Sequence, residues 1–193
     1  MTEEEIDKKS LEKAVALFET GKINNIEVGT VKGLYDIHLA LFGGLYNFAG
    51  KTRTDNISKG VTRFCQIQFL DSNLKIIEKM PQSTFDEIVE KYVEMNMAHP
   101  FREGNGRATR IWLDQIFKQA LGQVVDWASV DKREYLMAME RSPLKDLEIK
   151  DVLKRALTTD YNNRQVIFKG LACSYVIEGM DEYYANDYVE KYY

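Results

Sequence analysis

Apolar side chains recur every three or four positions along most of the chain, which is the spacing of helices that bury one face. The first such stretch runs from Leu11 to Phe18 and stops near Gly21, and the last runs from about residue 163 to residue 177. Short polar residues precede several stretches, as helix N-caps do, and glycines follow them, as at helix C-termini. The predicted helix starts are Thr30, Ser83 with Asp86 as its capping-box partner, Asp131 with Glu134, and Ser142–Pro143, and the predicted ends include Gly43–Gly44, Gly122 and Gly179.

Only the segment from Gly60 to Leu70 has the alternating pattern of a β-strand. Phe64, Ile67 and Phe69 are interleaved there with polar residues, and turn-forming residues precede them. An isolated two-stranded hairpin is marginally stable in water, so this one must rest on the helices. The sequence therefore predicts a mainly α fold with one small β-hairpin.

Length and composition narrow the class of protein. The chain has 193 residues, of which 45% are hydrophobic, and this favours a single globular domain over residues 1–193. A net charge of −4 argues against a nucleic-acid partner, and no apolar run is long enough to span a membrane. Two cysteines without a signal peptide favour a cytoplasmic protein with reduced thiols, and their spacing from the two histidines excludes a zinc site.

One stretch near the middle of the chain combines several reactive side-chain types. His99 ends a predicted helix, because the proline after it prevents the helix from continuing. Gly104 and Gly106 open the next helix, where successive backbone N–H groups favour an anion. Arg107 and Arg110 are three positions apart and share a face of that helix. A histidine base beside a phosphate-binding turn predicts transfer of a phosphorus-containing group to a hydroxyl.

The complete pattern is more specific than its parts. His99-x-Phe101-x-Glu103-Gly104-Asn105-Gly106-Arg107-x-x-Arg110 resembles the signature of the Fic family at every fixed position. The resemblance covers about residues 11–184, because residues 48–50 resemble the segment that leads to the family's flap, and residues 56–60 resemble the flap, which is expected over about 56–70. It implies a helical core with a β-hairpin flap, and transfer of AMP from ATP to a hydroxyl of a protein.

The resemblance implies a role for each position of the motif. His99 is the expected general base, Phe101 is expected to fix the loop, and Glu103 is the expected ligand of Mg²⁺. The phosphates are expected at Gly104, Asn105 and Gly106, with Arg107 at the β-phosphate and Arg110 at the γ-phosphate. Two glycines in the turn favour AMP transfer over the phosphate transfer of Doc-type relatives.

The adenine is expected between the flap, near Lys59 and Gly60, and the helix that carries residues 135–139. Met137 is a candidate contact of the base. Asn96 lies one helical turn before His99 and faces the same site, where it either supports the nucleotide or packs.

A second motif lies near the C-terminus. Ser174-Tyr175-Val176-Ile177-Glu178-Gly179 resembles the family's inhibitory pattern Ser/Thr-x-x-x-Glu-Gly/Asn, as in its single-domain class. The resemblance implies that a helix over about 163–179 covers the nucleotide site and that Glu178 pairs with Arg110, in the space that the γ-phosphate needs. Without the resemblance, the same string is a helix end with Gly179 as its cap.

Three functions stay open at this point: a self-inhibited protein adenylyltransferase, a dual or reverse activity in which Glu178 directs removal of AMP, and a helical interaction module without activity. The target protein is expected to add a strand to the flap at residues 61–69. Type II topoisomerase subunits are the first candidate targets by resemblance alone, and homo-oligomerisation is left open. In the helix and the acidic, tyrosine-rich tail over 180–193, the candidate sites of self-modification are Tyr175, Tyr183 and Tyr184.

Overall fold

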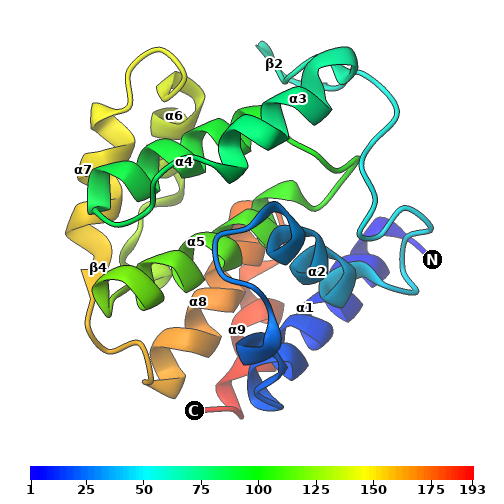
Figure 1. The fold of residues 1–193 in the computed structure, drawn as a ribbon. Helices are drawn as coiled ribbons and strands as arrows, with labels where there is room; N and C mark the ends of the chain where they lie inside the picture. Colours follow the sequence, from blue (N-terminus) through cyan, green and yellow to red (C-terminus); the bar gives the residue numbers. More distant parts are fainter.

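The computed structural model describes residues 1–193, and helices dominate it (Figure 1). The α-helices are α1 (Glu3–Glu19), α2 (Val31–Phe42), α3 (Ile67–Glu78), α4 (Phe85–Ala98), α5 (Asn105–Leu121), α6 (Lys132–Arg141), α7 (Leu147–Ala156), α8 (Arg164–Ile177) and α9 (Glu182–Glu190). Two short 3-10 helices, η1 (Lys22–Asn25) and η2 (Trp127–Ser129), lie between them. The prediction of a mainly α fold with a small hairpin is confirmed.

Two antiparallel strand pairs complete the fold. The predicted hairpin consists of β1 (Ser58–Lys59) and β2 (Thr62–Arg63), with Ser58 opposite Arg63. The second pair, β3 (Val124–Val125) with β4 (Leu157–Thr158), was not predicted, because two-residue strands are too short to show alternation.

The predicted strand over residues 60–70 is only partly correct. β2 ends at Arg63, and the residues from Ile67 onward form the first turn of α3. Leu70, Leu74 and Ile77 are the buried residues of α3, at helical spacing. The alternation up to Phe69 was therefore misleading, since the helical stripe begins inside it.

Several helix starts agree with the predictions, and two do not. Thr30, Asp131 and Asn163 accept hydrogen bonds from the first turns of α2, α6 and α8. α4 is capped by Thr84 with Glu87, one residue later than the predicted Ser83 with Asp86. No helix starts at Ser142–Pro143; α7 starts after Asp146.

The central element is α5, which packs against α2, α4 and α8 (Figure 1). Its buried side chains lie on all sides of the helix, which is typical of a helix enclosed by others. They include Ile111, Trp112, Leu113, Ile116 and Phe117. Because α5 begins at the glycine-rich turn, the core of the molecule holds the candidate site in place.

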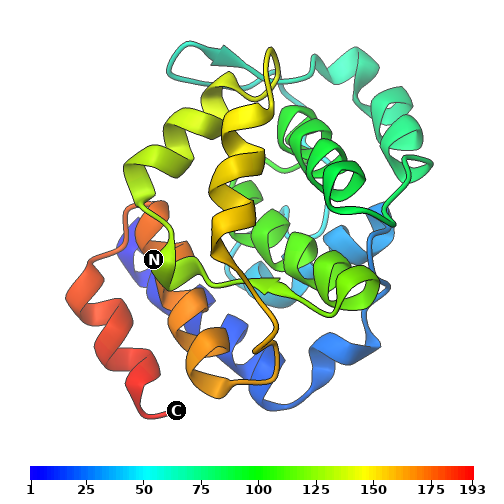
Figure 2. The same cartoon turned by 90° about the vertical axis from the view of Figure 1, so that its left-hand side faces the viewer.

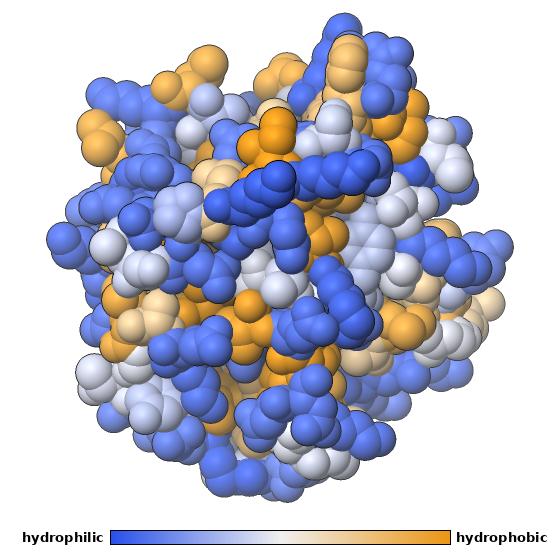
Figure 3. All heavy atoms as spheres, viewed as in Figure 1, coloured by the Kyte–Doolittle hydropathy of each residue, from blue (hydrophilic) through white to orange (hydrophobic).

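The C-terminal residues form helix α9, which lies along α8 (Figure 2). The tyrosine-rich tail over 180–193 is therefore largely helical. Ala185 and Val189 bury one side of α9, and the tyrosines that obscured this stripe lie mostly on its other faces. Hydrophilic residues cover most of the face shown in Figure 3, with smaller apolar areas between them. None of the helices combines the length and apolar character that crossing a membrane requires.

Candidate active site

His99 lies at the corner between α4 and the glycine-rich turn. It is the C-cap of α4 and has φ +47°, the only positive φ outside the glycines. Its Nδ1–H donates to the backbone carbonyl of Asn96 at 3.0 Å, which leaves Nε2 as the basic nitrogen. Phe64, beside the hairpin, stacks on the imidazole with 3.6 Å between ring centroids. Burial lowers the pKa of His99 to about 4, so the ring is neutral at physiological pH.

The turn between α4 and α5 is closed by its own residues. Phe101 is fully buried, as predicted. The Asn105 side chain accepts from the Phe101 backbone N–H at 2.9 Å and donates to the Phe101 carbonyl at 2.7 Å. The Asn105 amide therefore faces the loop, and only its backbone N–H is left for a phosphate. Gly104 has φ +82°, and a side chain there would collide with the ring of Phe42.

His38 supports this turn from α2. Its Nε2–H donates to the carbonyl of Glu103 at 2.8 Å, and its Nδ1 accepts from the backbone N–H of Gly50 at 3.0 Å. The ring stacks on Phe101 with 3.8 Å between centroids. Both ring nitrogens are used, and burial lowers the pKa of His38 to about 4, so this histidine is a structural residue.

The predicted ion pair between Arg110 and Glu178 is present. Arg110 Nη2 donates to Glu178 Oε1 at 2.7 Å, and Arg110 Nε donates to Ser174 Oγ at 2.7 Å. Lys59 of β1 lies 3.4 Å from the second carboxylate oxygen. Burial alone would raise the pKa of Glu178, but the charges of Arg110 and Lys59 lower it to about 2. The carboxylate is therefore ionised and links α5, α8 and the hairpin.

Glu178 also lies directly against the glycine-rich turn. A Cβ added to Gly106 would fall 2.1 Å from Glu178 Oε1, so only glycine admits the carboxylate at this distance. The N-terminus of α5 and its free backbone N–H groups favour an anion at this point. His99 ends the helix before this turn and Glu178 lies against Gly106 within it, so the base and the carboxylate border the same turn.

Arg107, the residue expected at the β-phosphate, is buried in a network of ion pairs. Its side chain is 5% exposed, and it forms ion pairs with Asp7 of α1 and with Glu103, the latter at 3.1 Å. The guanidinium lies over the rings of Phe42 and Tyr175, and its buried Nε has no hydrogen-bond partner. Through these contacts Arg107 joins α1, α5 and α8.

Glu103 is the accessible carboxylate of the turn. Its side chain is 52% exposed, and its Oε1 accepts from the backbone N–H of Gly104 at 2.9 Å. No group of three or more metal-ligating side chains occurs in the structure. One carboxylate beside a phosphate site fits Mg²⁺, because this ion is commonly held by one or two carboxylates together with substrate phosphates.

A groove separates the hairpin from α6, where the adenine was expected. Met97 of α4 and Met137 of α6 line this groove, together with residues of the hairpin and of the end of α6. Lys59 and Gly60 lie in the hairpin next to this groove, and the Asn96 side chain is half-buried near the end of α4. The other lining residues are Val61, Thr62, Arg63, Glu140, Arg141 and Leu144.

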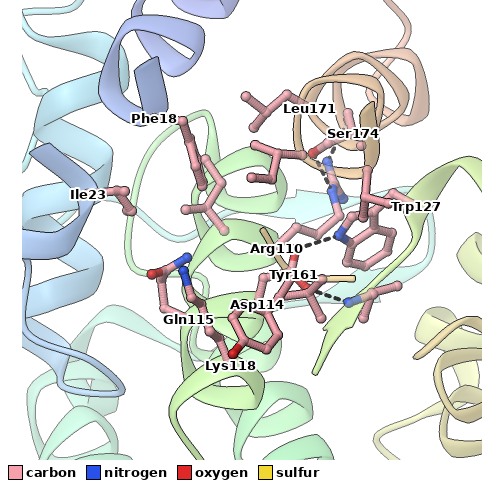
Figure 4. A pocket seen from close by; sticks show the side chains of 16 residues that line it. Phe18, Ile23, Arg110, Asp114, Gln115, Lys118, Trp127, Tyr161, Leu171 and Ser174 are labelled. Atoms are coloured by element: carbon pink, nitrogen blue, oxygen red, sulfur yellow. Dashed lines mark hydrogen bonds between the residues drawn. The ribbon is translucent and has the colours of Figure 1, made fainter. Parts of the chain in front are cut away.

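A separate cavity lies between the end of α1, α5 and α8 (Figure 4). Arg110 and Ser174 line it, but His99 and Glu178 do not, so it is distinct from the candidate active site. Asp114 in its wall accepts from the N–H groups of Val125 and Trp127 at 2.9 and 2.8 Å. Burial raises the pKa of Asp114 to about 7.

The three candidate self-modification sites differ in exposure. Tyr175 is buried, and its hydroxyl is hydrogen-bonded to Ser10 Oγ at 2.6 Å. Tyr183 is 82% exposed, while Tyr184 is half-buried under the ammonium of Lys8. Tyr175 is thus out of reach in this conformation, and its modification requires α8 to open. Gly179 follows Glu178 with φ +107° and ends α8, as predicted.

Two residues of the site cannot be identified from the sequence alone. Asp7 pairs with Arg107, and Arg53 donates to the carbonyl of His99 at 2.7 Å. Neither belongs to a motif: Asp7 lies in an acidic first helix and Arg53 in a polar loop. Charged residues in such places are usually solvated, so no local signal distinguished them.

Known proteins resemble this chain in sequence and in fold. Residues 29–117 match the model of the Fic/DOC family. The chain is 30% identical to the protein adenylyltransferase VbhT of Bartonella schoenbuchensis over 83% of its length, and this match covers 37% of VbhT. It is 28% identical to the probable protein adenylyltransferase Fic of Escherichia coli K12, over 71% of this chain and 76% of that protein.

Solved structures share the fold. The N-terminal Fic domain of a Bartonella effector protein from Bartonella sp. AR 15-3 has a TM-score of 0.72 at 18% identity, with 83% of this chain and 85% of that chain covered. BepC of Bartonella tribocorum, solved with bound AMPPNP, has a TM-score of 0.68 at 20% identity, with 80% and 85% covered.

Proposed function

We propose that this chain, whose residues 29–117 match the Fic/DOC family model, is a member of that family that transfers AMP from ATP to a hydroxyl of a target protein and inhibits itself through Glu178. The observation that carries the proposal is the position of the Glu178 carboxylate. It lies against Gly106 and on Arg110, in the same site as the neutral His99. The names of the relatives support the reaction, and one related fold holds an ATP analogue.

The reaction follows from the protonation state of His99. The Nε2 of the neutral imidazole takes the proton of the target hydroxyl, whose oxygen attacks the α-phosphorus of ATP. A bond from this oxygen to phosphorus forms, the bond to the bridging oxygen breaks, and diphosphate leaves. The free N–H groups at the start of α5 stabilise the charge on the phosphates. Glu103 would hold Mg²⁺ together with the phosphates, and the ion would supply positive charge to the leaving group.

Inhibition follows from competition for Arg110. The γ-phosphate of a productively bound ATP needs this guanidinium, which Glu178 already binds at 2.7 Å. ATP that binds beside the carboxylate is displaced, so its α-phosphate is not aligned for attack, and a misplacement of about 1 Å can cost ~10²-fold in rate. Ser174 holds the same guanidinium, so α8 as a whole keeps Glu178 in place.

The reverse reaction, removal of AMP with Glu178 as the base, receives less support. A base is most effective when its pKa lies near the working pH. The pKa of Glu178 is about 2 in this conformation, because Arg110 and Lys59 outweigh the effect of burial. Such a carboxylate is a weak base.

The target protein is proposed to dock at the hairpin. β1 and β2 are a two-stranded sheet with free outer edges, and strand addition would place a target hydroxyl near His99 through main-chain hydrogen bonds alone. Purified type II topoisomerase subunits are the first candidates to assay.

The test compares wild type, Glu178→Gly and Glu178→Gly/His99→Ala with α-labelled ATP, Mg²⁺, and either a lysate or the purified candidate targets. We expect strong labelling with Glu178→Gly, weak labelling with wild type and none with the double variant. Labelled product is then repurified and incubated with each enzyme without ATP. Loss of label in that step would support the reverse activity, and no label with any variant would contradict the proposed transfer.

A further inference from the structure

Arg53 is a buried cation in the segment between α2 and the hairpin. Arg53 is 4% exposed, and its guanidinium donates hydrogen bonds only to backbone carbonyls. The acceptors are His99 at 2.7 Å, Asp55 at 2.6 Å, Ala98 at 3.2 Å and Cys65. The backbone N–H of Arg53 also donates to the Pro100 carbonyl at 2.8 Å. No carboxylate forms an ion pair with this side chain.

The four carbonyls belong to two parts of the molecule, the end of α4 and the segments that flank the hairpin. Those of Ala98 and His99 end α4, where carbonyls lack helical partners and favour a cation. Those of Asp55 and Cys65 flank the hairpin on its two sides. The Cys65 N–H in turn donates to the carbonyl of Met97 at 2.9 Å. One side chain therefore ties both ends of the hairpin to the helix end that carries His99.

This connection acts on the conformation of His99. A non-glycine residue at φ +47° is uncommon and persists only where its surroundings hold it. Arg53 fixes the peptide after this residue, since it binds the His99 carbonyl. It also fixes Cys65, whose neighbour Phe64 covers the imidazole. Both the backbone and the ring of His99 are thus held through Arg53.

Only arginine suits this position. A guanidinium presents five N–H donors in a planar fork, whereas a lysine ammonium is a point with three. Lysine would keep the charge but could not reach carbonyls on opposite sides of the fork. The exchange of arginine for lysine therefore separates the geometry of this contact from its charge.

We propose that Arg53 is a positioning residue that holds His99 and the hairpin in register, so that a target bound on the hairpin meets the base. The inference rests on the proposed function, because it assumes that His99 acts on a target hydroxyl. It predicts a defect in the chemical step and in target docking, with little effect on nucleotide binding, since Arg53 does not contact the residues of the phosphate site.

The experiment uses Glu178→Gly as the active parent. Adding Arg53→Lys should lower kcat about 10- to 100-fold, as expected for a misplaced base. The KM for ATP should change by less than about threefold, since uniform binding is not affected. Arg155→Lys is the matched control, because Arg155 is an exposed arginine of α7 that pairs with Glu134 and Asp151. An unchanged kcat with Arg53→Lys would overturn the proposal.

Two further measurements exclude a purely structural role. Hydrogen exchange of Arg53→Lys should accelerate at residues 56–66 and 97–99 and stay unchanged in α1 and α8, whereas uniform acceleration would contradict the proposal. Methylguanidinium should restore part of the activity of Arg53→Ala and none to Arg155→Ala, and absence of rescue would also count against it. If the Glu178→Gly parent transfers no AMP, the proposed function fails, while the hydrogen-exchange test of the Arg53 connection still stands.

Discussion

Two parts of the molecule meet at Glu178, and they are held in opposite ways. The start of α5 is fixed by buried polar contacts: Arg110 binds Ser174 and Glu178, and Arg107 binds Asp7. The β1–β2 hairpin is exposed and has two residue pairs in its ladder. Its one ion pair to the site joins Lys59 to Glu178 at 3.4 Å.

The difference indicates that the two parts have different functions. Catalysis of phosphoryl chemistry requires charges that are in place before the reaction, and the buried network supplies them. Docking of varied target segments requires a free strand edge, which the hairpin supplies. Substitutions in the first part should therefore change rate or stability strongly, and substitutions in the second should change only the use of the target.

The largest expected effect comes from His99. In the Glu178→Gly background, His99→Ala should lower AMP transfer about 10²- to 10⁴-fold, because the target hydroxyl loses its base. ATP affinity should change little, since the His99 side chain hydrogen-bonds only to the Asn96 carbonyl and carries no charge for the phosphates. Calorimetric titration of ATP and Mg²⁺ measures this affinity. Transfer at an undiminished rate would remove His99 from the mechanism.

The second prediction concerns Arg110 and Glu178 as a pair. Glu178→Gly should raise the steady-state rate about 10²-fold, because it frees Arg110 for the γ-phosphate. Arg110→Ala should not raise it, since the same guanidinium serves ATP. The double variant should resemble Arg110→Ala, because residues that act on one site are not additive. A double variant as fast as Glu178→Gly would show that ATP does not use Arg110.

The third prediction concerns the stability that the buried polar contacts at the start of α5 contribute. Asp7→Ala leaves the buried Arg107 with Glu103 as its remaining carboxylate partner, and the loss of the charge-assisted hydrogen bond to Asp7 should lower the free energy of unfolding by about 2 kcal/mol. The control is Asp71→Ala, which breaks an exposed pair with Lys75 and should have no measurable effect. Urea denaturation of both variants gives the comparison, and equal midpoints would mean that the Asp7 pair contributes nothing.

How far a contact reaches along the chain explains what the sequence could predict. The motif from His99 to Arg110, the helix over 163–177 and the pair between Arg110 and Glu178 were predicted, since each depends on local spacing or on the family signature. Asp7 and Arg53 were not, because their partners lie 100 and 46 residues away in the chain. Only the folded structure shows that Arg53 is buried and that Asp7 lies against the buried Arg107.

The errors in the fold have a similar origin. The first turn of α3 continues an alternating pattern, so the pattern predicts a strand where a helix begins. Ser83 and Thr84 are both good caps, so the predicted start of α4 falls one residue early. The partner of Arg107 could not be predicted either, because the motif gives the residue type and only the fold brings Asp7 of α1 against the guanidinium. The role of Arg107 at the β-phosphate stays a prediction.

The fourth prediction concerns the hairpin edge. Phe64 N–H donates to the Ile57 carbonyl, and hydrogen-bonded pairs alternate along an antiparallel ladder, so the N–H of Arg63 points away from β1. In the Glu178→Gly background, Arg63→Pro removes this donor and should lower target modification about tenfold relative to Arg63→Ala, which keeps it. ATP affinity should be equal in the two variants. A proline that lowers ATP affinity and target modification alike would contradict docking at this edge.

The smallest expected effect is that of pH. A base must be neutral, and burial lowers the pKa of His99 from the usual 6.5 to about 4, so His99 stays neutral as the pH falls to about 5. In Glu178→Gly the carboxylate that raises this pKa is gone, which moves it further in the same direction. The transfer rate should therefore vary less than about twofold between pH 5.5 and 8. Adding Phe64→Ala uncovers the imidazole and should return the pKa toward 6.5, so that this variant loses activity as the pH falls below that value. An inflection near pH 6.5 in Glu178→Gly itself would show that His99 is solvated during the reaction and that the hairpin does not cover it.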